Sequence, residues 1–471
     1  MSATRPRVIV VGGGLSGLSC AVACGDAGAA VTLVEGRPRL GGATWSFERK
    51  GLSFDNGQHV HLRCCDQYRA FLDRLGTAEL APIRGSLAIP VVRPAPGSAA
   101  GCDPRTAWIR RADLPAPLHL ARSLLTYGHL SLLDRLRLFP AAVGLRAIGL
   151  DDPRLDTQTF GEWLRRHGQS SRAVSALWDL ITLPTTNLPA NEVSLALAAK
   201  VFQTGLLTDA RAADIGWSNV PLAQLHVEPA RRVLEQLGAE VRCGAKVTEI
   251  VMSGERAVRG VVAGGEVLEA EAVVLAVPHG QAAALLPQGA FGDRPAPPLS
   301  LLGASPIVNV HLVFDRRVMD HELAAAIDSP AQFVFDRTAA AGVPPSSGFQ
   351  VLAVSLSGAD AEIGVRPKNL ISEQRRALAA LFPAVRQAEV VDAVVTREHE
   401  ATFRGLPGTR SLRLGPATAI GNLALAGAWT DTGWPATMEG AVRSGLAAAR
   451  HVMAEPGCGL SRSHRPKEVI A

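Results

Sequence analysis

A glycine-rich turn near the start of the chain constrains its fold more than any other feature. The apolar run Val8–Val11 is followed directly by this turn and then by a small-residue helix pattern that continues to about Gly25. The order predicts a strand, a tight turn and a helix, with a phosphate group bound at the helix N-terminus, as in dinucleotide-binding sheets. The residues expected beside the pyrophosphate are Gly12, Gly14, Leu15, Ser16 and Gly17.

An acidic residue after the second apolar run supports this interpretation. Ala30–Val34 ends in Glu35, close to the spacing of about 20 residues at which a carboxylate binds ribose hydroxyls. A carboxylate there repels a 2′-phosphate, so the pattern favours a cofactor with a free ribose over NADP. Glu35 alone leaves NAD and FAD both open.

The segment that continues from Glu35 resembles the second signature of the flavin amine oxidase and carotenoid desaturase superfamily, and this resemblance implies FAD. Arg39 can neutralise phosphate charge, while two glycines let the main chain pass beside the cofactor. Family members often carry a further basic residue where this chain has Ala43. The candidate contacts in this segment are Glu35, Gly36, Arg37, Arg39, Gly41 and Gly42.

The C-terminal part of the chain resembles the other half of the same cofactor site. Leu423–Ala426 reads as a strand, and a helix is expected to begin near Thr437. The resemblance implies that this helix points its positive end at the flavin. Ala428 replaces the acidic residue of the family pattern, so the corresponding hydrogen bond is missing or moves to Asp431. The candidate contacts are Gly427, Trp429, Asp431, Pro435, Ala436, Thr437 and Met438.

The pattern predicts an α/β fold in which a Rossmann-like FAD-binding domain of the flavin amine oxidase type is combined with a discontinuous α+β substrate domain. Alternating strand signals in residues 224–277 belong to the cofactor domain, and the resemblance places Val247 near the adenine end. We expect the cofactor domain in 1–84, 222–289 and 413–454, the substrate domain in 85–221 (mostly helical) and 290–412, and a mobile tail in 455–471.

Two segments narrow the family. Phe54–Val60 and Trp434–Gly445 closely resemble the squalene-associated FAD-dependent desaturases, a group better described as hydroxysqualene dehydroxylases. The resemblance implies reductive removal of the hydroxyl of hydroxysqualene to give squalene for hopanoid or related triterpenoid synthesis, with hydride supplied from N5 of reduced flavin. Gly57, Gln58 and His59 are expected beside the cofactor.

The leaving hydroxyl needs a proton, and His59 is the most attractive donor because imidazole titrates near neutral pH. Asp55 is expected to orient His59 or to bind the flavin. Trp434 and Trp45 are candidates for stabilising a carbocation through their aromatic faces. A purely structural role for His59, fixing its loop, stays open.

Other enzymes of the same superfamily are the main alternatives. A squalene or carotenoid (phytoene-type) desaturase would share the fold and an apolar substrate, and the direction of electron flow is not visible in a sequence. A flavin amine oxidase generally places a lysine near flavin N5, whereas Ile307–Phe314 contains none. The amine oxidase interpretation is therefore less favoured.

Charge and composition limit the partners. The formal net charge is +5 without a dense basic stripe, which argues against nucleic-acid binding, and the cysteines form no metal-ligating pattern. No second glycine fingerprint follows residue 42, so we expect reduced nicotinamide or another external reductant, supplied transiently or by a reductase. The expected substrate is a C30 isoprenoid, and other squalene-pathway enzymes are further candidate partners.

Leucines and arginines alternate between Leu118 and Leu150 in a stretch too short and too charged to span a bilayer. The segment fits either an interfacial helix on anionic lipid or an ordinary helix of the substrate domain. A nearly insoluble C30 substrate favours a membrane surface. Because Val8 begins a strand and not a signal sequence, we expect a cytoplasmic protein that is peripheral on the inner face of the cell membrane.

Overall fold

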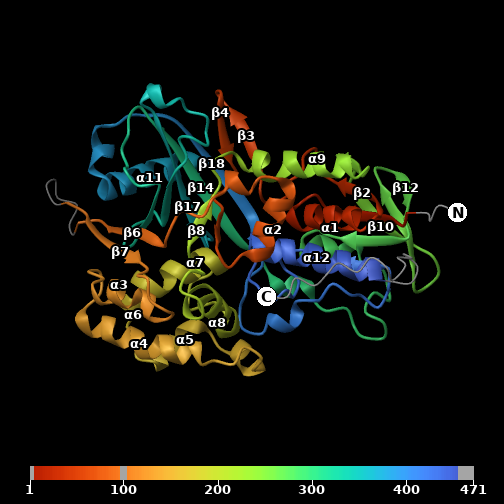
Figure 1. Cartoon of the computed structure of the whole chain (residues 1–471), viewed down its shortest axis with the longest axis horizontal. Coiled ribbons are helices and arrows are strands. Elements are labelled where there is room, and N and C mark those ends of the chain that lie inside the picture. The colour runs from red at the N-terminus through yellow and green to blue at the C-terminus, as the bar shows by residue number, and fades with distance from the viewer. Residues whose placement is uncertain (1–4, 96–102, 455–471) are drawn as a thin grey trace.

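The computed structural model describes residues 5–95 and 103–454, and the predicted mobile tail at 455–471 lies outside them. One part of the molecule is built on a five-stranded parallel sheet (Figure 1). Its strands, in sheet order, are β9 (Glu240–Cys243), β2 (Ala30–Glu35), β1 (Arg7–Val11), β13 (Ala272–Leu275) and β19 (Leu423–Leu425). This is the doubly wound order 3-2-1-4-5, in which ligands bind at the carboxyl ends of the strands where the order reverses.

Helices from both ends of the chain pack together beside this sheet. α1 and α12 lie side by side in Figure 1, and a Cβ added at Gly445 of α12 would meet Ser16 O at 2.2 Å. Such a close approach is possible only for glycine, so the first and last helices are tightly joined. The helices of this part are α1 (Leu15–Asp26), α2 (Asp66–Leu75), α9 (Glu228–Gln236), α10 (His279–Leu285) and α12 (Met438–Ala454).

A seven-stranded sheet forms the second part of the molecule. In sheet order it contains β18 (Val390–Thr402), β14 (Ser305–Phe314), β17 (Gln350–Ser357), β16 (Phe333–Asp336), β15 (Leu323–Ala326), β6 (Ala88–Arg93) and β7 (Arg105–Arg110). Sequence patterns did not indicate the β6–β7 hairpin in the stretch predicted as mostly helical. It joins the sheet through β6, which pairs in parallel with β15 more than 200 residues away.

The two faces of β14 have different roles. Val308, Val310 and Leu312 point into an apolar core together with α11 (Pro367–Leu381). The alternate residues Asn309 and His311 are also fully buried, but they contact the segment around Phe54 and Asn56. Since alternate side chains of a strand face opposite sides, β14 separates the core from a polar site.

A helical layer lies below the seven-stranded sheet, drawn in orange to yellow-green in Figure 1. Its α-helices are α3 (Ala121–Leu125), α4 (Leu132–Arg146), α5 (Phe160–Arg166), α6 (Ser171–Ala173), α7 (Asp179–Thr186) and α8 (Leu195–Phe202). They enclose an apolar cluster centred on Phe160, Trp178 and Phe202. No helix within 5–95 and 103–454 has the length and apolar character needed to cross a membrane.

Shorter strands form three further small sheets. They are β3 (Ser46–Arg49) with β4 (Leu52–Asp55), β5 (Val60–Leu62) with β8 (Ile215–Trp217), and the separate sheet β10 (Val247–Met252), β11 (Val258–Ala263) and β12 (Glu266–Glu269). The pair β3–β4 leads directly into the loop 56–59. The predicted domain boundaries remain a proposal, with the parallel sheet drawing strands from each of the three segments assigned to the cofactor domain.

Candidate cofactor and active site

The glycine turn between β1 and α1 leaves an anion-binding helix end. A Cβ at Gly17 would lie 1.8 Å from Gly12 O, so only glycine lets α1 pack this closely on the turn. No side chain caps α1 at Gly14, and its first turn contains no acidic residue. Leu15 and Ser16 are buried there. Buried, uncapped N–H groups at a helix start require an acceptor, which a phosphate group provides.

Glu35 holds this turn against the end of β2. Its carboxylate accepts hydrogen bonds from Gly13 N at 2.7 Å and from Arg37 N at 2.8 Å. Each carboxylate oxygen retains a further lone pair, because an ionised carboxylate offers about four acceptor positions. The position at the carboxyl end of a parallel strand is where ribose hydroxyls are bound in doubly wound sheets.

The second glycine pair packs directly on the first motif. Gly41 N donates to Gly13 O at 2.8 Å, and a Cβ at Gly42 would meet Gly14 Cα at 2.8 Å. The glycines of the two motifs therefore form a cradle in which main chain contacts main chain directly. Gly36 packs against Lys246, the residue before Val247. The segment predicted to lie at the adenine end therefore contacts the second glycine motif.

Arg39 supplies a positive charge that lacks a complete set of partners. Its Nη1 is buried with no hydrogen-bond partner in the described structure, and its guanidinium lies 3.8 Å from the ring centroid of Trp45. Burial, followed by the neighbouring charge of Arg37, lowers the pKa of Arg39. A buried donor without an acceptor is costly, and a phosphate would satisfy it. The uncapped helix, the glycine cradle and Arg39 together fit a dinucleotide pyrophosphate.

The C-terminal motif meets the N-terminal one through two serines. Gly427 N donates to Ser444 Oγ at 2.9 Å, and this hydroxyl lies 3.1 Å from Ser16 Oγ. Ser444 carried no sequence signal beyond its place in the C-terminal motif. Its position next to α1 brings the two halves of the predicted cofactor site together.

Two predicted C-terminal residues have their polar groups engaged elsewhere. The Trp429 indole donates to Val277 O at 2.9 Å and packs over Gly427. Asp431 is exposed and accepts from Gly433 N at 3.2 Å, so it stabilises a surface turn. A hydrogen bond moved from Ala428 to Asp431 therefore stays a prediction without a visible partner.

The start of α12 is capped by its own sequence. Thr437 Oγ1 accepts a hydrogen bond from Gly440 N at 3.2 Å. Pro435 is buried, while Ala436 and Met438 are partly buried on either side of Thr437. The cap fixes the direction of the helix whose positive end is predicted to face the flavin.

Arg413, which the sequence patterns did not single out, holds the loop before α12. Its guanidinium donates to the carbonyl oxygens of Trp429 at 3.2 Å, Thr430 at 2.6 Å and Trp434 at 2.7 Å. Burial lowers the pKa of Arg413 to about 10, so it remains a cation at neutral pH. One partly buried side chain therefore sets the shape of the predicted flavin-facing loop.

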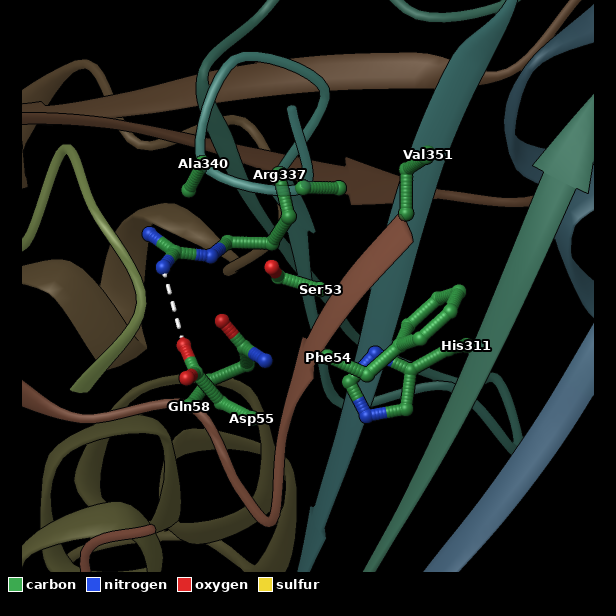
Figure 2. A pocket seen from close by; sticks show the side chains of 9 residues that line it. Ser53, Phe54, Asp55, Gln58, His311, Arg337, Ala340 and Val351 are labelled. Carbon is green, nitrogen blue, oxygen red and sulfur yellow. Dashed lines mark hydrogen bonds and ion pairs between the residues drawn. The ribbon is translucent and has the colours of Figure 1, made fainter. Parts of the chain in front are cut away.

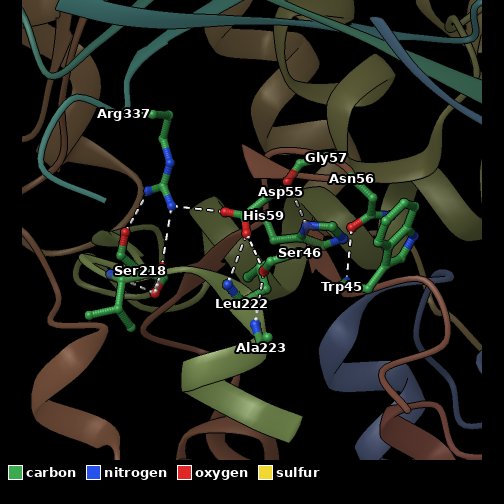
Figure 3. A network of polar contacts seen from close by, with 11 residues as sticks. Trp45, Ser46, Asp55, Asn56, Gly57, His59, Ser218, Leu222, Ala223 and Arg337 are labelled. Atoms are coloured by element: carbon green, nitrogen blue, oxygen red, sulfur yellow. Dashed lines mark hydrogen bonds and ion pairs between the residues drawn. The ribbon is translucent and has the colours of Figure 1, made fainter. Parts of the chain in front are cut away.

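Asp55 is the centre of a buried polar network (Figure 3). It forms an ion pair with Arg337 at 3.0 Å and accepts hydrogen bonds from Ser46 Oγ at 2.7 Å and Leu222 N at 2.9 Å. Arg337 also donates to Ser218 O at 2.5 Å. The network connects the loop after β4 with the seven-stranded sheet.

His59 lies on that loop but is not hydrogen-bonded to Asp55. Its Nδ1 is 3.1 Å from Gly57 O, which assigns the Nδ1–H tautomer and leaves Nε2 as the other ring nitrogen. Burial is the largest influence on His59 and lowers its pKa. The neutral imidazole therefore predominates at neutral pH. Asp55 acts on His59 through its charge, and its predicted role in orienting His59 or binding the flavin stays a prediction.

Glu398 of β18 is a second acidic group that the sequence patterns missed. Its Oε1 accepts from Trp45 Nε1 at 2.9 Å and from Asn56 Nδ2 at 2.9 Å. Its negative charge also acts on Arg39 and His59. Glu398 therefore brings a negative charge from the seven-stranded sheet to the predicted cofactor site.

Asp55 and Arg337 are among the residues that line a small cavity (Figure 2). Gln58 and His311 line it, and Gln58 Nε2 and His311 Nε2 are buried without hydrogen-bond partners in the part of the chain that is described. Burial lowers the pKa of His311 to about 4, so this imidazole is neutral. The predicted cofactor residue Gln58 thus adjoins a polar recess that is also lined by the Asp55–Arg337 ion pair.

The predicted aromatic pair is surrounded by cations. Arg39 lies over Trp45, while Arg443 and Lys200 lie 5.0 and 5.8 Å from the ring centroid of Trp434. Trp45 precedes β3 and Trp434 precedes α12, so the two rings come from opposite ends of the chain. Their aromatic faces already interact with positively charged side chains.

Four residues that stabilise the site lie outside the predicted motifs. Arg337, Asn309, Glu398 and Arg413 all lie in or beside the second part of the predicted substrate domain. No short motif marks them, because each is defined by a partner more than 15 residues away. Only an apolar strand interrupted by polar residues, as at Asn309 and His311, gave a signal that could have been used.

Comparisons with known proteins agree with this geometry. The profile of the family described as flavin containing amine oxidoreductase matches residues 15–453. Hydroxysqualene dehydroxylases from Sinorhizobium fredii and Rhodopseudomonas palustris are 28% and 29% identical, each over 95% of this chain and 99% and 98% of their own length. A 15-cis-phytoene desaturase from Narcissus pseudonarcissus is 25% identical over 96% of this chain and 81% of its own length.

Solved structures share the fold. Putrescine oxidase bound to putrescine superposes with a TM-score of 0.71 at 19% identity, covering 96% of this chain and 100% of the other. Cyclohexylamine oxidase from Brevibacterium oxydans gives a TM-score of 0.70 at 19% identity, covering 95% and 99%. The predicted fold class is therefore confirmed.

Proposed function

The chain belongs to the flavin containing amine oxidoreductase family and is an FAD-dependent oxidoreductase, and we propose that it reductively removes the hydroxyl of hydroxysqualene to give squalene. The observation that carries this proposal is the match to curated hydroxysqualene dehydroxylases over nearly the full length of both chains. In the hopanoid or triterpenoid pathway, such a reaction would supply squalene.

The predicted cofactor residues come from both ends of the chain, and each end is proposed to bind a different part of FAD. In this proposal, the turn at Gly12–Gly17 and Arg39 hold the pyrophosphate, while Glu35 holds the ribose. The C-terminal loop and the start of α12 bound the flavin end. The pyrophosphate would supply a hydrogen-bond acceptor to Arg39 Nη1, which has no partner in the described structure.

The proposed reaction consumes a hydride and a proton. The C–O bond breaks, the proton joins the leaving oxygen to form water, and the hydride forms the new C–H bond. Bound FAD in its reduced form supplies the hydride. His59 supplies the proton from Nε2, while its Nδ1–H is held by Gly57 O.

The electrostatics of the loop bear on this role for His59. Its lowered pKa makes the imidazolium scarce at neutral pH but more acidic when it forms. The charges of Asp55 and Glu398 favour the imidazolium and partly offset burial. Asp55 is proposed to act by fixing the loop through Arg337. Trp434, flanked by Arg443 and Lys200, is proposed to form a wall of the site, because these cations would repel a carbocation.

A decisive test is to incubate purified, FAD-loaded protein with hydroxysqualene and a chemical reductant, without oxygen, and to identify the product by mass spectrometry. Squalene, lacking the oxygen atom of the substrate, is the expected product. Recovery of unchanged hydroxysqualene beside reoxidisable FAD would contradict the proposal. Repeating the reaction with NADH, NADPH or a reductase identifies the external electron donor.

A desaturase is the second candidate, because phytoene desaturases also match almost the whole chain. That enzyme would remove two hydrogens from a polyene and leave FAD reduced. Oxidised enzyme given squalene or phytoene would then form a product lighter by two hydrogen atoms. An amine oxidase is disfavoured because β14 presents Asn309 and His311 to the site and contains no lysine.

The proposed substrate, a C30 isoprenoid with one hydroxyl, partitions strongly into lipid. An enzyme acting on it is therefore expected at a bilayer, on the cytoplasmic face of the cell membrane. The reductase and neighbouring squalene-pathway enzymes are the further partners that this proposal requires or allows.

A further inference from the structure

Exposed apolar side chains are concentrated in one segment of the chain. Twelve large apolar residues are exposed in the described chain, and seven of them lie between residues 114 and 143. They are Leu114, Leu118, Leu125, Leu132, Leu133, Leu136 and Val143. A soluble surface scatters such residues singly, whereas a concentration of this kind marks a surface that contacts another apolar phase.

Helix α4 shows that these leucines are not parts of a loosely packed core. Leu138, Ala141 and Leu145 lie on one side of the helix and are buried. Leu132, Leu136 and Val143 follow the helical repeat on the opposite side and are 51–66% exposed. One face of the helix therefore packs against the core, and a second apolar face is exposed to solvent.

The charge around this apolar surface is strongly positive. Residues 105–146 contain seven arginines and only two aspartates, a local excess equal to the formal net charge of +5 of the whole chain. Arg122, Arg137 and Arg146 are exposed among or beside the leucines. One of the aspartates, Asp134, accepts hydrogen bonds from Ser131 and Ser170, so its charge is partly engaged within the protein.

We propose that residues 114–143, hereafter the leucine face, dock onto the surface of an anionic lipid bilayer. Leucine side chains enter the boundary between headgroups and acyl chains, while the arginines contact lipid phosphates. The inference rests on the proposed function in one respect: a substrate dissolved in lipid gives the protein a reason to bind a bilayer. Its physical support is the outward apolar face of α4 and the arginine excess around it.

The leucine face belongs to the helical layer, at the end of the molecule remote from the parallel sheet (Figure 1). Docking there would leave α1, α9 and α12 free of the bilayer. The predicted FAD site would thus stay accessible to a water-soluble reductant while the helical layer contacts the lipid that holds the substrate.

The test is flotation of the FAD-loaded full chain with vesicles of phosphatidylcholine alone or mixed with phosphatidylglycerol. The wild type is expected to float with the mixed vesicles. The variant Leu132→Gln/Leu133→Gln/Leu136→Gln should lower the bound fraction at least about tenfold, because it removes three inserted side chains. Val267→Gln/Leu301→Gln/Val391→Gln alters equally exposed residues elsewhere and should float like the wild type.

A second variant tests the charge. Arg122→Gln/Arg137→Gln should raise the apparent Kd for mixed vesicles by about tenfold or more and weaken its dependence on salt. Circular dichroism and bound FAD absorbance establish that each variant is folded. Unchanged flotation of the folded leucine variant would overturn the proposal.

Two further measurements distinguish lipid docking from self-association and from damage to the active site. If light scattering finds a dimer that the leucine variant converts to a monomer, and vesicles bind neither form, the leucine face is a contact between two copies and the proposal fails. Turnover of hydroxysqualene in detergent micelles should be equal for wild type and leucine variant. Flotation is measured without substrate, so its result does not depend on whether the protein catalyses the proposed reaction.

Discussion

Asp55 and Arg337 form an ion pair at 3.0 Å with only 5% and 8% of their side chains exposed. Asp55 precedes the loop that carries Gln58 and His59, and Arg337 follows β16 of the seven-stranded sheet. The pair therefore attaches the predicted catalytic loop to the part of the molecule assigned to substrate binding. Its rupture should affect both stability and the position of His59.

Replacing Arg337 with Met should lower the free energy of unfolding by about 3–5 kcal/mol, because Asp55 would remain buried without its partner. Urea unfolding of the FAD-loaded protein measures this. Arg317→Met is the matched control, since Arg317 pairs with Asp320, which is 92% exposed, and should change stability by less than about 1 kcal/mol. Equal effects of the two substitutions would contradict a structural role for the buried pair.

Replacing Glu35 with Ala should weaken FAD binding at least about tenfold, since it removes the acceptor of Gly13 N and Arg37 N and the proposed ribose partner. Equilibrium dialysis of the deflavinated protein gives the Kd. Glu35→Gln, which keeps one acceptor oxygen, should lie between the wild type and Glu35→Ala. A fully flavinated Ala variant with unchanged affinity would disprove the assignment.

Replacing His59 with Ala should reduce kcat by about 100-fold or more while FAD remains bound. Burial lowers the pKa of His59 below 6.5, so the proton-donating imidazolium becomes common only as the pH falls below that value. Turnover of the wild type should accordingly rise with decreasing pH, and this rise should be absent in the variant. His399→Ala, an exposed histidine on β18, serves as the control and should retain the wild-type pH profile.

Glu439 provides a test of stability against pH. Burial raises its pKa from 4.5 to about 7, although Tyr68 N and Arg443 donate to its carboxylate. A raised carboxyl pKa gives stability that is present below 4.5 and is lost as the pH rises through about 7. The loss should be of the order of 3 kcal/mol.

Urea midpoints measured at pH 4.5 and pH 8 detect this loss. Glu439→Gln cannot ionise, so its stability should fall less than that of the wild type over the same range. The comparison uses the change with pH and not the absolute stability, because the substitution also alters the contact with Arg443. Identical pH dependence in the two proteins would show that Glu439 does not titrate in this range.

Replacing Arg413 with Met should lower the free energy of unfolding by about 3 kcal/mol, because three loop carbonyls lose their partly buried donor. The absorption spectrum of bound FAD should also change, since the loop before α12 would no longer be fixed. Arg413→Lys retains one cationic donor and should restore part of both effects. A wild-type spectrum in Arg413→Met would exclude a positioning role.

Local motifs made the parallel-sheet part of the fold predictable. The turn at Gly12–Gly17 and the acid at Glu35 are short segments whose spacing is set by one strand and one helix. The β6–β7 hairpin was missed because β6 gains its sheet partner β15 from a segment far along the chain, while the surrounding stretch is dominated by helical patterns. Long-range pairing leaves no periodic mark on either partner.

The same distinction applies to the candidate site. His59 and Gln58 were found because their loop follows a recognisable segment, whereas Arg337 lies 282 residues from Asp55. Because Asp55 precedes the loop that carries His59, it is expected to orient His59 or to bind the flavin, and both roles stay predictions. The structure gives Asp55 three other partners, because a buried carboxylate is stabilised most by a cation and by backbone donors.

The order of strands in the parallel sheet also affects how the protein is synthesised. β19 pairs with β13, and α12 packs on α1. The side of α1 that faces α12 is therefore covered only after the C-terminal helix has been synthesised. During translation the nascent chain therefore carries an incomplete Rossmann sheet with an open edge at β13. Chaperone demand and aggregation of truncated chains should be high until the C-terminal strand emerges from the ribosome.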